Sequence, residues 1–179
     1  MPRIAPILAF LLAVVTFADP ASANAVRVFE AQQGAWKASC YKDPGSDEPY
    51  CHLMVIHTFA DGSKTGNFVR FGPVFDRDKR GVVVASYLGF AKKSKISIQV
   101  DMDGAEDKKW SDPAPKTNHL VIPEQVSGEI LTAMEAGQSL RLKFKPATGI
   151  AQNIKVSLTD YRDLLKAVTK VLAGETVSR

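Results

Sequence analysis

The sequence is poor in cysteine, histidine and long apolar runs, and its charges are nearly balanced. It contains 2 Cys and 3 His in 179 residues, too few for a disulfide scaffold or a cysteine-rich zinc site. Lys and Arg number 23 against 19 Asp and Glu, and the net charge of +4 falls short of a nucleic-acid-binding composition. A hydrophobic content of 45% excludes a disordered chain, and the pattern is neither collagen-like nor that of a coiled coil.

The length indicates one folded domain. A chain of 179 residues buries enough apolar surface to fold without help from a disulfide or a metal. No internal repeat, low-complexity segment or long linker divides it. We therefore expect a single β-rich domain over residues 24–179, preceded by a targeting segment over residues 1–23.

The N-terminus has the organisation of a secretory signal peptide. Arg3 precedes an apolar run over residues 4–18, and small residues occupy positions 21–23. The run is shorter than the ~20 residues of a membrane-spanning helix, and no cysteine follows it to carry a lipid. Cleavage is expected after Ala23, with Ala25 as the alternative site. We expect an exported protein, periplasmic or secreted, with no transmembrane segment in its mature chain.

The two cysteines, Cys40 and Cys51, have one possible intramolecular pairing. An exported chain enters an oxidising compartment, so a Cys40–Cys51 disulfide is expected. Closing so short a loop stabilises a fold by about 2–3 kcal/mol in the chain-entropy picture. A reactive or metal-binding pair is the weaker interpretation, because such sites use the tighter Cys-x-x-Cys spacing.

Alternation of apolar and polar residues predicts several antiparallel strands. The clearest runs from Ile96 to Asp103, where every second residue is apolar and its neighbours are polar. Residues 26–33 are taken as a short leader, and turns are expected at 42–49, 61–64 and 76–81. The predicted strands cover residues 34–41, 51–59, 65–71, 82–88, 96–103, 140–144 and 154–158.

Two segments have helical periodicity. Residues 124–136 carry apolar side chains at every fourth position and end at Gly137, although Ser127 and Gly128 weaken this helix. A stronger C-terminal helix is capped by Ser157 or Thr159. Its apolar stripe consists of Leu158, Tyr161, Leu164, Leu165, Val168 and Leu172. The sequence thus predicts a mainly β fold, an antiparallel β-sandwich or partly open barrel with a C-terminal helix and one short helix.

The order of these elements resembles that of a known family. Trp36 and Cys40, a turn-rich loop, Cys51, and the strands over residues 96–103 and 138–158 are similar to those of the invasion-associated locus B family. The family consists of exported alphaproteobacterial proteins. The resemblance implies an envelope-associated accessory protein with a bridged first cysteine pair. Many relatives carry a further close cysteine pair where residues 118–123 stand here.

No catalytic, metal-ligating or cofactor-binding constellation emerges from the sequence. His52 and His57 are five residues apart and point to opposite faces of a regular strand, and His119 is remote in sequence. The carboxylates over residues 101–107 lack the glycine and glutamate positions of a calcium loop. Residues 62–65 resemble only the end of a phosphate loop. We predict no catalytic residue, no metal and no cofactor, and the pattern identifies no ligand-binding residue.

Basic residues gather in three places: residues 92–95, residues 108–109, and the alternating Arg141, Lys143 and Lys145. They suit an anionic envelope component or an acidic envelope protein, although lysines on strand faces also serve solubility. Trp110 lies among polar residues and is a candidate contact residue, while Trp36 is expected in the core.

We therefore expect a non-enzymatic accessory or binding protein of the periplasm or cell envelope, with an unidentified envelope protein or anionic component as its partner. Two alternatives stay open. One is a small exported hydrolase whose carboxylate or histidine pair is assembled only in three dimensions. The other is an envelope chaperone or inhibitor that lends a sheet edge to a client.

Overall fold

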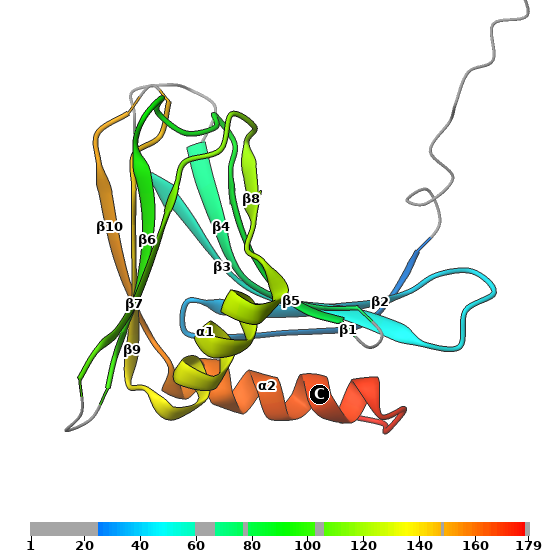
Figure 1. Ribbon diagram of the computed structural model, residues 1–179. Coiled ribbons are helices and arrows are strands. Elements are labelled where there is room, and N and C mark those ends of the chain that lie inside the picture. The colour runs from blue at the N-terminus through cyan, green and yellow to red at the C-terminus, as the bar shows by residue number, and fades with distance from the viewer. Residues whose placement is uncertain (1–24, 60–66, 77–78, 103–105, 148, 178–179) are drawn as a thin grey trace, which may run out of the picture.

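The chain folds into antiparallel sheets flanked by helices (Figure 1). The structure is a computed structural model, and it describes residues 25–59, 67–76, 79–102, 106–147 and 149–177. The strands are β1 (Val26–Gln33), β2 (Trp36–Lys42), β3 (Pro49–Phe59), β4 (Asn67–Asp76), β5 (Lys79–Ser86), β6 (Lys95–Asp101), β7 (Lys108–Pro113), β8 (His119–Val121), β9 (Ser139–Phe144) and β10 (Gln152–Ser157). The helices are α1 (Glu124–Ala136) and α2 (Thr159–Leu172). Within these residues, one sheet has the order β1-β2-β3-β4-β5-β8 and the other β10-β9-β6-β7.

The two sheets face each other across a shared hydrophobic core (Figure 1). In β6, Ile96, Ile98 and Val100 are buried while the residues between them are partly exposed. The alternate residues of β9 and β10 are buried in the same way, because a strand directs successive side chains to opposite faces. This confirms the predicted mainly β fold with a C-terminal helix and a shorter one, in its sandwich form.

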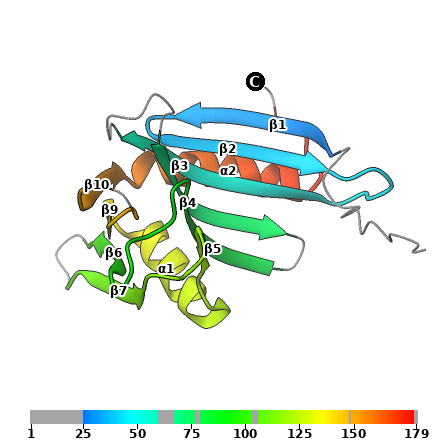
Figure 2. The same cartoon turned by 90° about the horizontal axis from the view of Figure 1, so that it is seen from above.

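Helix α2 lies beneath β1, β2 and β3 (Figure 2). The fully buried Trp36 joins the strands to the helix. Its indole nitrogen Nε1 donates a 2.7 Å hydrogen bond to the backbone oxygen of Ser157, and its ring centroid is 5.0 Å from that of Tyr161. The last element of the chain therefore covers the strands that begin it.

The structure joins Cys40 and Cys51 in a disulfide, the pairing that the sequence predicts. The two residues are direct partners in the β2–β3 ladder, and neither side chain is exposed. The bond therefore fixes the two strands to each other at the base of the turn that connects them.

Helix α1 packs against β5, β6 and β7 and lies at one end of the sandwich (Figures 1 and 2). Ser127, which the sequence suggests is a weakness, anchors it. The buried Ser127 hydroxyl donates to the oxygen of Ile122 at 3.0 Å and accepts from the Val82 N–H at 3.1 Å.

The helix ends before Gly137 as predicted, but Gly137 is extended, with φ −80°. The close approach of Val100 and the Asp101 carbonyl leaves no room for a side chain there.

Three strands and one helix cap differ from the sequence-based expectation. Residues 26–33, taken as a leader, form the edge strand β1. β7 and β8 were not predicted, because β7 is mostly exposed and polar and β8 has only 3 residues. The N-cap of α2 is Leu158, although the Ser157 hydroxyl accepts from the Thr159 N–H at 3.1 Å.

Some expectations lie outside the described residues. These are the signal segment over residues 1–23 and the turn at 61–64, together with parts of the turn at 76–81 and of the strand at 65–71. Within the ranges given above, neither helix is long and apolar enough to cross a membrane.

Candidate functional site

An open groove lies between helix α1 and strand β7. Its volume is about 590 Å³. β7 contributes Lys108 and Trp110, and Met102 lies at the end of β6. The helix contributes Gly128, Glu129, Thr132, Ala133 and Ala136. The lining is largely apolar with a few polar groups, which is the usual composition of a ligand-binding site.

Trp110 forms the β7 wall of this groove. It pairs with the buried Ile98 across the ladder, so it lies on the face of β7 that is turned towards the core. The side chain is partly buried, and its Nε1 donates a 3.3 Å hydrogen bond to the Glu129 carboxylate on α1. The residue that the sequence marks as a contact candidate therefore borders the larger of the two hollows described here.

Gly128 leaves space in the helix wall of the groove. A Cβ atom placed on it would meet nothing within 4 Å, so no steric conflict requires glycine at this position. Glycine inside a helix is about 1 kcal/mol less favourable than alanine. The helix therefore gives up stability at a position that opens onto the groove.

β7 is an edge strand. Within the described residues it pairs with β6 on one side and has no strand on the other. Every second backbone N–H and C=O of such a strand faces outward and is able to pair with another chain. The groove and this free edge lie side by side, since Trp110 belongs to both.

A second, shallower hollow lies on the outer face of the larger sheet. Its volume is about 210 Å³, and it is lined by Lys37, Ser39, Tyr41, His52, Met54, Ile56 and Arg70. The ring of His52 is 6.0 Å from Tyr41 and 5.8 Å from Tyr50, centroid to centroid. More of its lining is polar, and no helix borders it.

The three histidines are dispersed. His52 lies on the outer face of β3, and His57, five residues on, has the opposite parity in the strand, as predicted. His119 lies on β8, where its Nδ1 is 3.2 Å from the side-chain oxygen of Asn118. Among the described residues, no group of three or more His, Cys, Asp or Glu side chains is placed to hold a metal ion.

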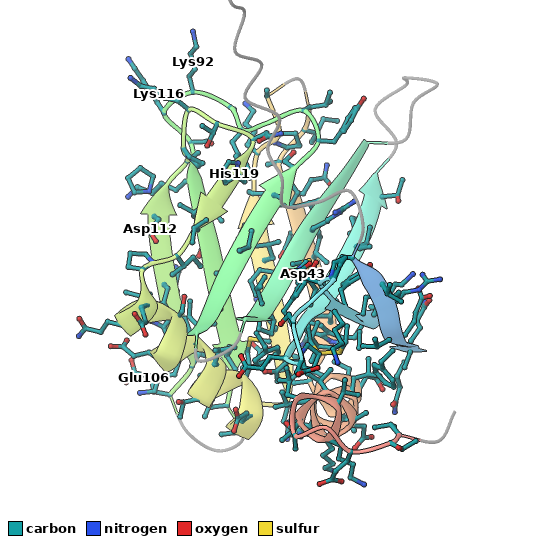
Figure 3. All side chains as sticks on the ribbon, turned by 90° about the vertical axis from the view of Figure 1, so that its right-hand side faces the viewer. Asp43, Lys92, Glu106, Asp112, Lys116 and His119 are labelled. Carbon is teal, nitrogen blue, oxygen red and sulfur yellow. A yellow bond between two sulfur atoms is a disulfide. The ribbon has the colours of Figure 1, made fainter. Side chains whose placement is uncertain are left out.

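The predicted basic segments are separated in space. Residues 92–95 lie at the end of the sandwich that is opposite α1, close to Lys145 (Figure 3). Lys108 and Lys109 begin β7 at the other end. Arg141 lies on β9 within 4.0 Å of Asp101. The three basic segments of the sequence therefore do not form one continuous surface.

The negative charge of Asp101, at the end of β6, is balanced by neighbouring basic side chains. Its carboxylate accepts a hydrogen bond from the Ser139 hydroxyl and lies 3.2 Å from Lys155 Nζ. The hydrogen bond from Ser139 is the main cause that holds the pKa of Asp101 below its ordinary value. Burial opposes it, and the hydrogen bond and charge of Lys155 and the charge of Arg141 add to the lowering. Asp107 binds the Met102 N–H and the Gln99 amide, so these two carboxylates stabilise a strand end.

The protein is thus a two-sheet antiparallel domain in which helix α1 and the free edge of β7 border an open, largely apolar groove. The structure is similar to the crystal structure of invasion associated protein B from Bartonella henselae, with a TM-score of 0.47 and 16% sequence identity. The similarity covers 80% of this chain and 97% of that one. No protein-family model and no curated protein matches the sequence. The resemblance to the invasion-associated locus B family thus stays a prediction at the level of sequence.

Proposed function

We propose that the protein is an exported, envelope-associated binding protein that holds an extended segment of a partner protein in the groove between α1 and β7. The observation that carries this proposal is the open groove of about 590 Å³ that lies beside the outer edge of β7, with Trp110 belonging to both. The bound segment continues the smaller sheet by pairing with the outer edge of β7. This combines the expected accessory role with the alternative of a sheet edge lent to a client.

The groove specifies what such a segment carries. Its wall of Met102, Trp110 and Ala133 suits one apolar side chain of the bound strand. Lys108 and Glu129, also in the lining, are able to pair with charged neighbours of that side chain. The affinity comes from backbone hydrogen bonds along β7, and the selectivity comes from this pocket.

The test compares two substitutions at Gly128 in the full chain. Gly128→Ala adds a single methyl group, and Gly128→Leu fills the groove; both introduce better helix formers, so both variants are expected to fold. An array of peptides of about eight residues, the length of an ordinary strand, is screened against each protein. Peptides that bind wild type and Gly128→Ala, but bind Gly128→Leu at least about tenfold more weakly, are the expected result.

A second readout tests the strand pairing. Methylating the backbone nitrogen at alternate residues of a bound peptide removes the donors that face β7 in one register and spares them in the other. One methylated series is expected to lose binding while the other keeps it. Equal binding of all peptides to the wild type and Gly128→Leu, or indifference to methylation in both series, contradicts the proposal.

We also propose that the protein performs no catalysis. The carboxylate in the groove, Glu129, already accepts a hydrogen bond from Trp110. The purified chain is expected to leave envelope glycans and peptides unchanged in prolonged incubation. Turnover of either by wild type, with loss of turnover in Gly128→Leu, would instead support the hydrolase alternative.

A further inference from the structure

Three loops meet at the end of the sandwich that lies opposite α1, and we name this surface the loop end. It consists of residues 87–95, 113–119 and 145–151, except Thr148. Hydrogen bonds tie the loops together: the Ala91 N–H donates to the Lys145 oxygen at 2.9 Å, and the Ala114 N–H donates to the Ser94 oxygen at 3.0 Å. Figure 3 shows Lys92 and Lys116 at this end and Glu106 at the other. The loop end is thus a defined surface built from distant parts of the sequence.

The loop end concentrates positive charge. Its lysines are all exposed: Lys92, Lys93, Lys95, Lys116 and Lys145. The three segments contain no Asp or Glu. These five charges exceed the net charge of +4 that the whole chain carries, so the remainder of the chain is slightly acidic overall. The loop end therefore accounts for the net positive charge of the protein.

Exposed apolar side chains accompany the lysines. Ile150 is 83% exposed and Tyr87 is 55% exposed, and both lie in the same loops. Isolated exposed apolar residues are common on soluble proteins, but an aromatic and a branched aliphatic residue beside lysines is the composition of a membrane interface.

The basic residues of the loop end are all lysines, which favours binding to an extended anionic surface over binding to a single anion. The loop end has no arginine. Arginine binds a carboxylate or phosphate through two parallel hydrogen bonds, whereas lysine acts as a mobile, hydrated point charge. Neither of the two hollows described above includes a residue of the loop end. The geometry therefore points to a lipid headgroup surface.

We propose that the loop end docks the protein on an anionic membrane surface, with its lysines at the headgroups and with Ile150 and Tyr87 in the interface. This inference is independent of the peptide groove, because it uses none of the groove residues. A membrane-bound molecule presents the α1 end, with Glu106, away from the lipid (Figure 3).

The test measures binding of the full chain to vesicles of phosphatidylcholine alone and of phosphatidylcholine with phosphatidylglycerol. An uncleaved apolar N-terminus would bind both kinds of vesicle, so the readout is the ratio of the two partition coefficients. Each lysine near an anionic surface strengthens binding about fivefold, so loss of two lysines lowers this ratio about 25-fold. The double variant Lys92→Glu, Lys116→Glu also adds two repelled negative charges, so it is expected to lower the ratio on the order of a hundredfold. Raising NaCl from about 0.05 M to about 0.5 M is expected to have the same direction of effect in the wild type.

The matched control reverses two lysines elsewhere, Lys109→Glu on β7 and Lys170→Glu on α2, both exposed. It changes the net charge equally and is expected to leave the ratio within about threefold of wild type. Ile150→Ser is expected to weaken binding to anionic vesicles several-fold without changing its dependence on salt. An equal loss in both double variants, or no preference of the wild type for anionic vesicles, overturns the proposal. So does binding of soluble inorganic polyphosphate by the same lysines without binding to vesicles.

Discussion

At the scale of single residues, Asp101 is a point where several segments of the chain meet. Its carboxylate binds Ser139 and Lys155, and its backbone oxygen accepts from the Gln138 N–H at 2.9 Å. These contacts connect the end of β6 to β9, to β10 and to the segment that leaves α1. Because the contacts favour the ionised carboxylate, the folded state holds the pKa of Asp101 below its ordinary value.

Asp101→Asn is expected to destabilise the protein by about 1 kcal/mol at neutral pH, because it removes the negative charge that strengthens the Ser139 hydrogen bond and pairs with Lys155 at a partly exposed position. A lowered folded-state pKa contributes stability that is present above the ordinary value of 3.8 and is lost as the pH falls through the folded-state value. The difference between variant and wild type should therefore shrink with acidification.

Urea unfolding at about pH 7 and about pH 2.5 measures that difference, with Glu175→Gln as an exposed control that should change little at either pH. A deficit of Asp101→Asn that is as large at low pH as at neutral pH would show that the charge of Asp101 is not what stabilises this junction.

At the scale of elements, sequence periodicity located the strands and helices that have one face in the core. β6, β9, β10 and α2 bury their apolar stripes, so each was evident from the sequence. Strand β7 was not predicted, because it lies at a sheet edge and exposes most of its side chains. Its sequence therefore lacks the alternation of apolar and polar residues that indicates a strand. Trp110 was identified as a contact candidate, but its position opposite α1 depends on contacts between elements that are distant in sequence.

Ser127 and Gly128 both have low helix propensity, but they have different roles in α1. The sequence suggests that both weaken α1, and propensity scales agree. In the structure the buried Ser127 hydroxyl joins the helix to Val82 of β5 and to Ile122, which precedes the helix, and no local pattern reveals these two hydrogen bonds. Gly128 does cost the helix stability, and the open space beside it is visible only once β7 is in place.

Gly128→Ala is therefore expected to raise the stability of the protein by about 0.5–1 kcal/mol, since alanine favours the helix and meets no neighbour at this position. The midpoint of urea unfolding checks this, with Gly137→Ala as the opposite case. Gly137 has Val100 and a backbone carbonyl against it, so an added methyl group should destabilise there. Destabilisation by Gly128→Ala would mean that the glycine is needed for the backbone itself.

At the scale of the whole molecule, the two proposed surfaces lie apart. The groove is bordered by α1 at one end of the sandwich, and the lysine-rich loops lie at the other (Figures 1 and 3). A molecule held to lipid by its loop end keeps the groove open to the surrounding compartment. In these two proposals, the lysines set the orientation of the molecule at the membrane, and the groove holds the partner segment.

The core of the whole domain is expected to tolerate loss of the disulfide. The bond closes a loop with a sequence separation of 11, which corresponds to about 2–3 kcal/mol in the chain-entropy picture. The double variant Cys40→Ala, Cys51→Ala should therefore melt about 5–10 °C lower than wild type while remaining folded at room temperature. Circular dichroism on heating measures both. A double variant that is unfolded before heating would show that the buried core alone does not sustain the fold.

The placement of α2 has a consequence for how the chain acquires its structure. Trp36 and Ser157 are 121 positions apart, yet they are hydrogen-bonded, and α2 follows Ser157 directly. A chain delivered N-terminus first, by a ribosome or through a pore, presents β1–β3 long before the helix that covers them. These strands therefore lack the helix that covers them until residues 159–172 have emerged, and their packing against α2 cannot be completed before then.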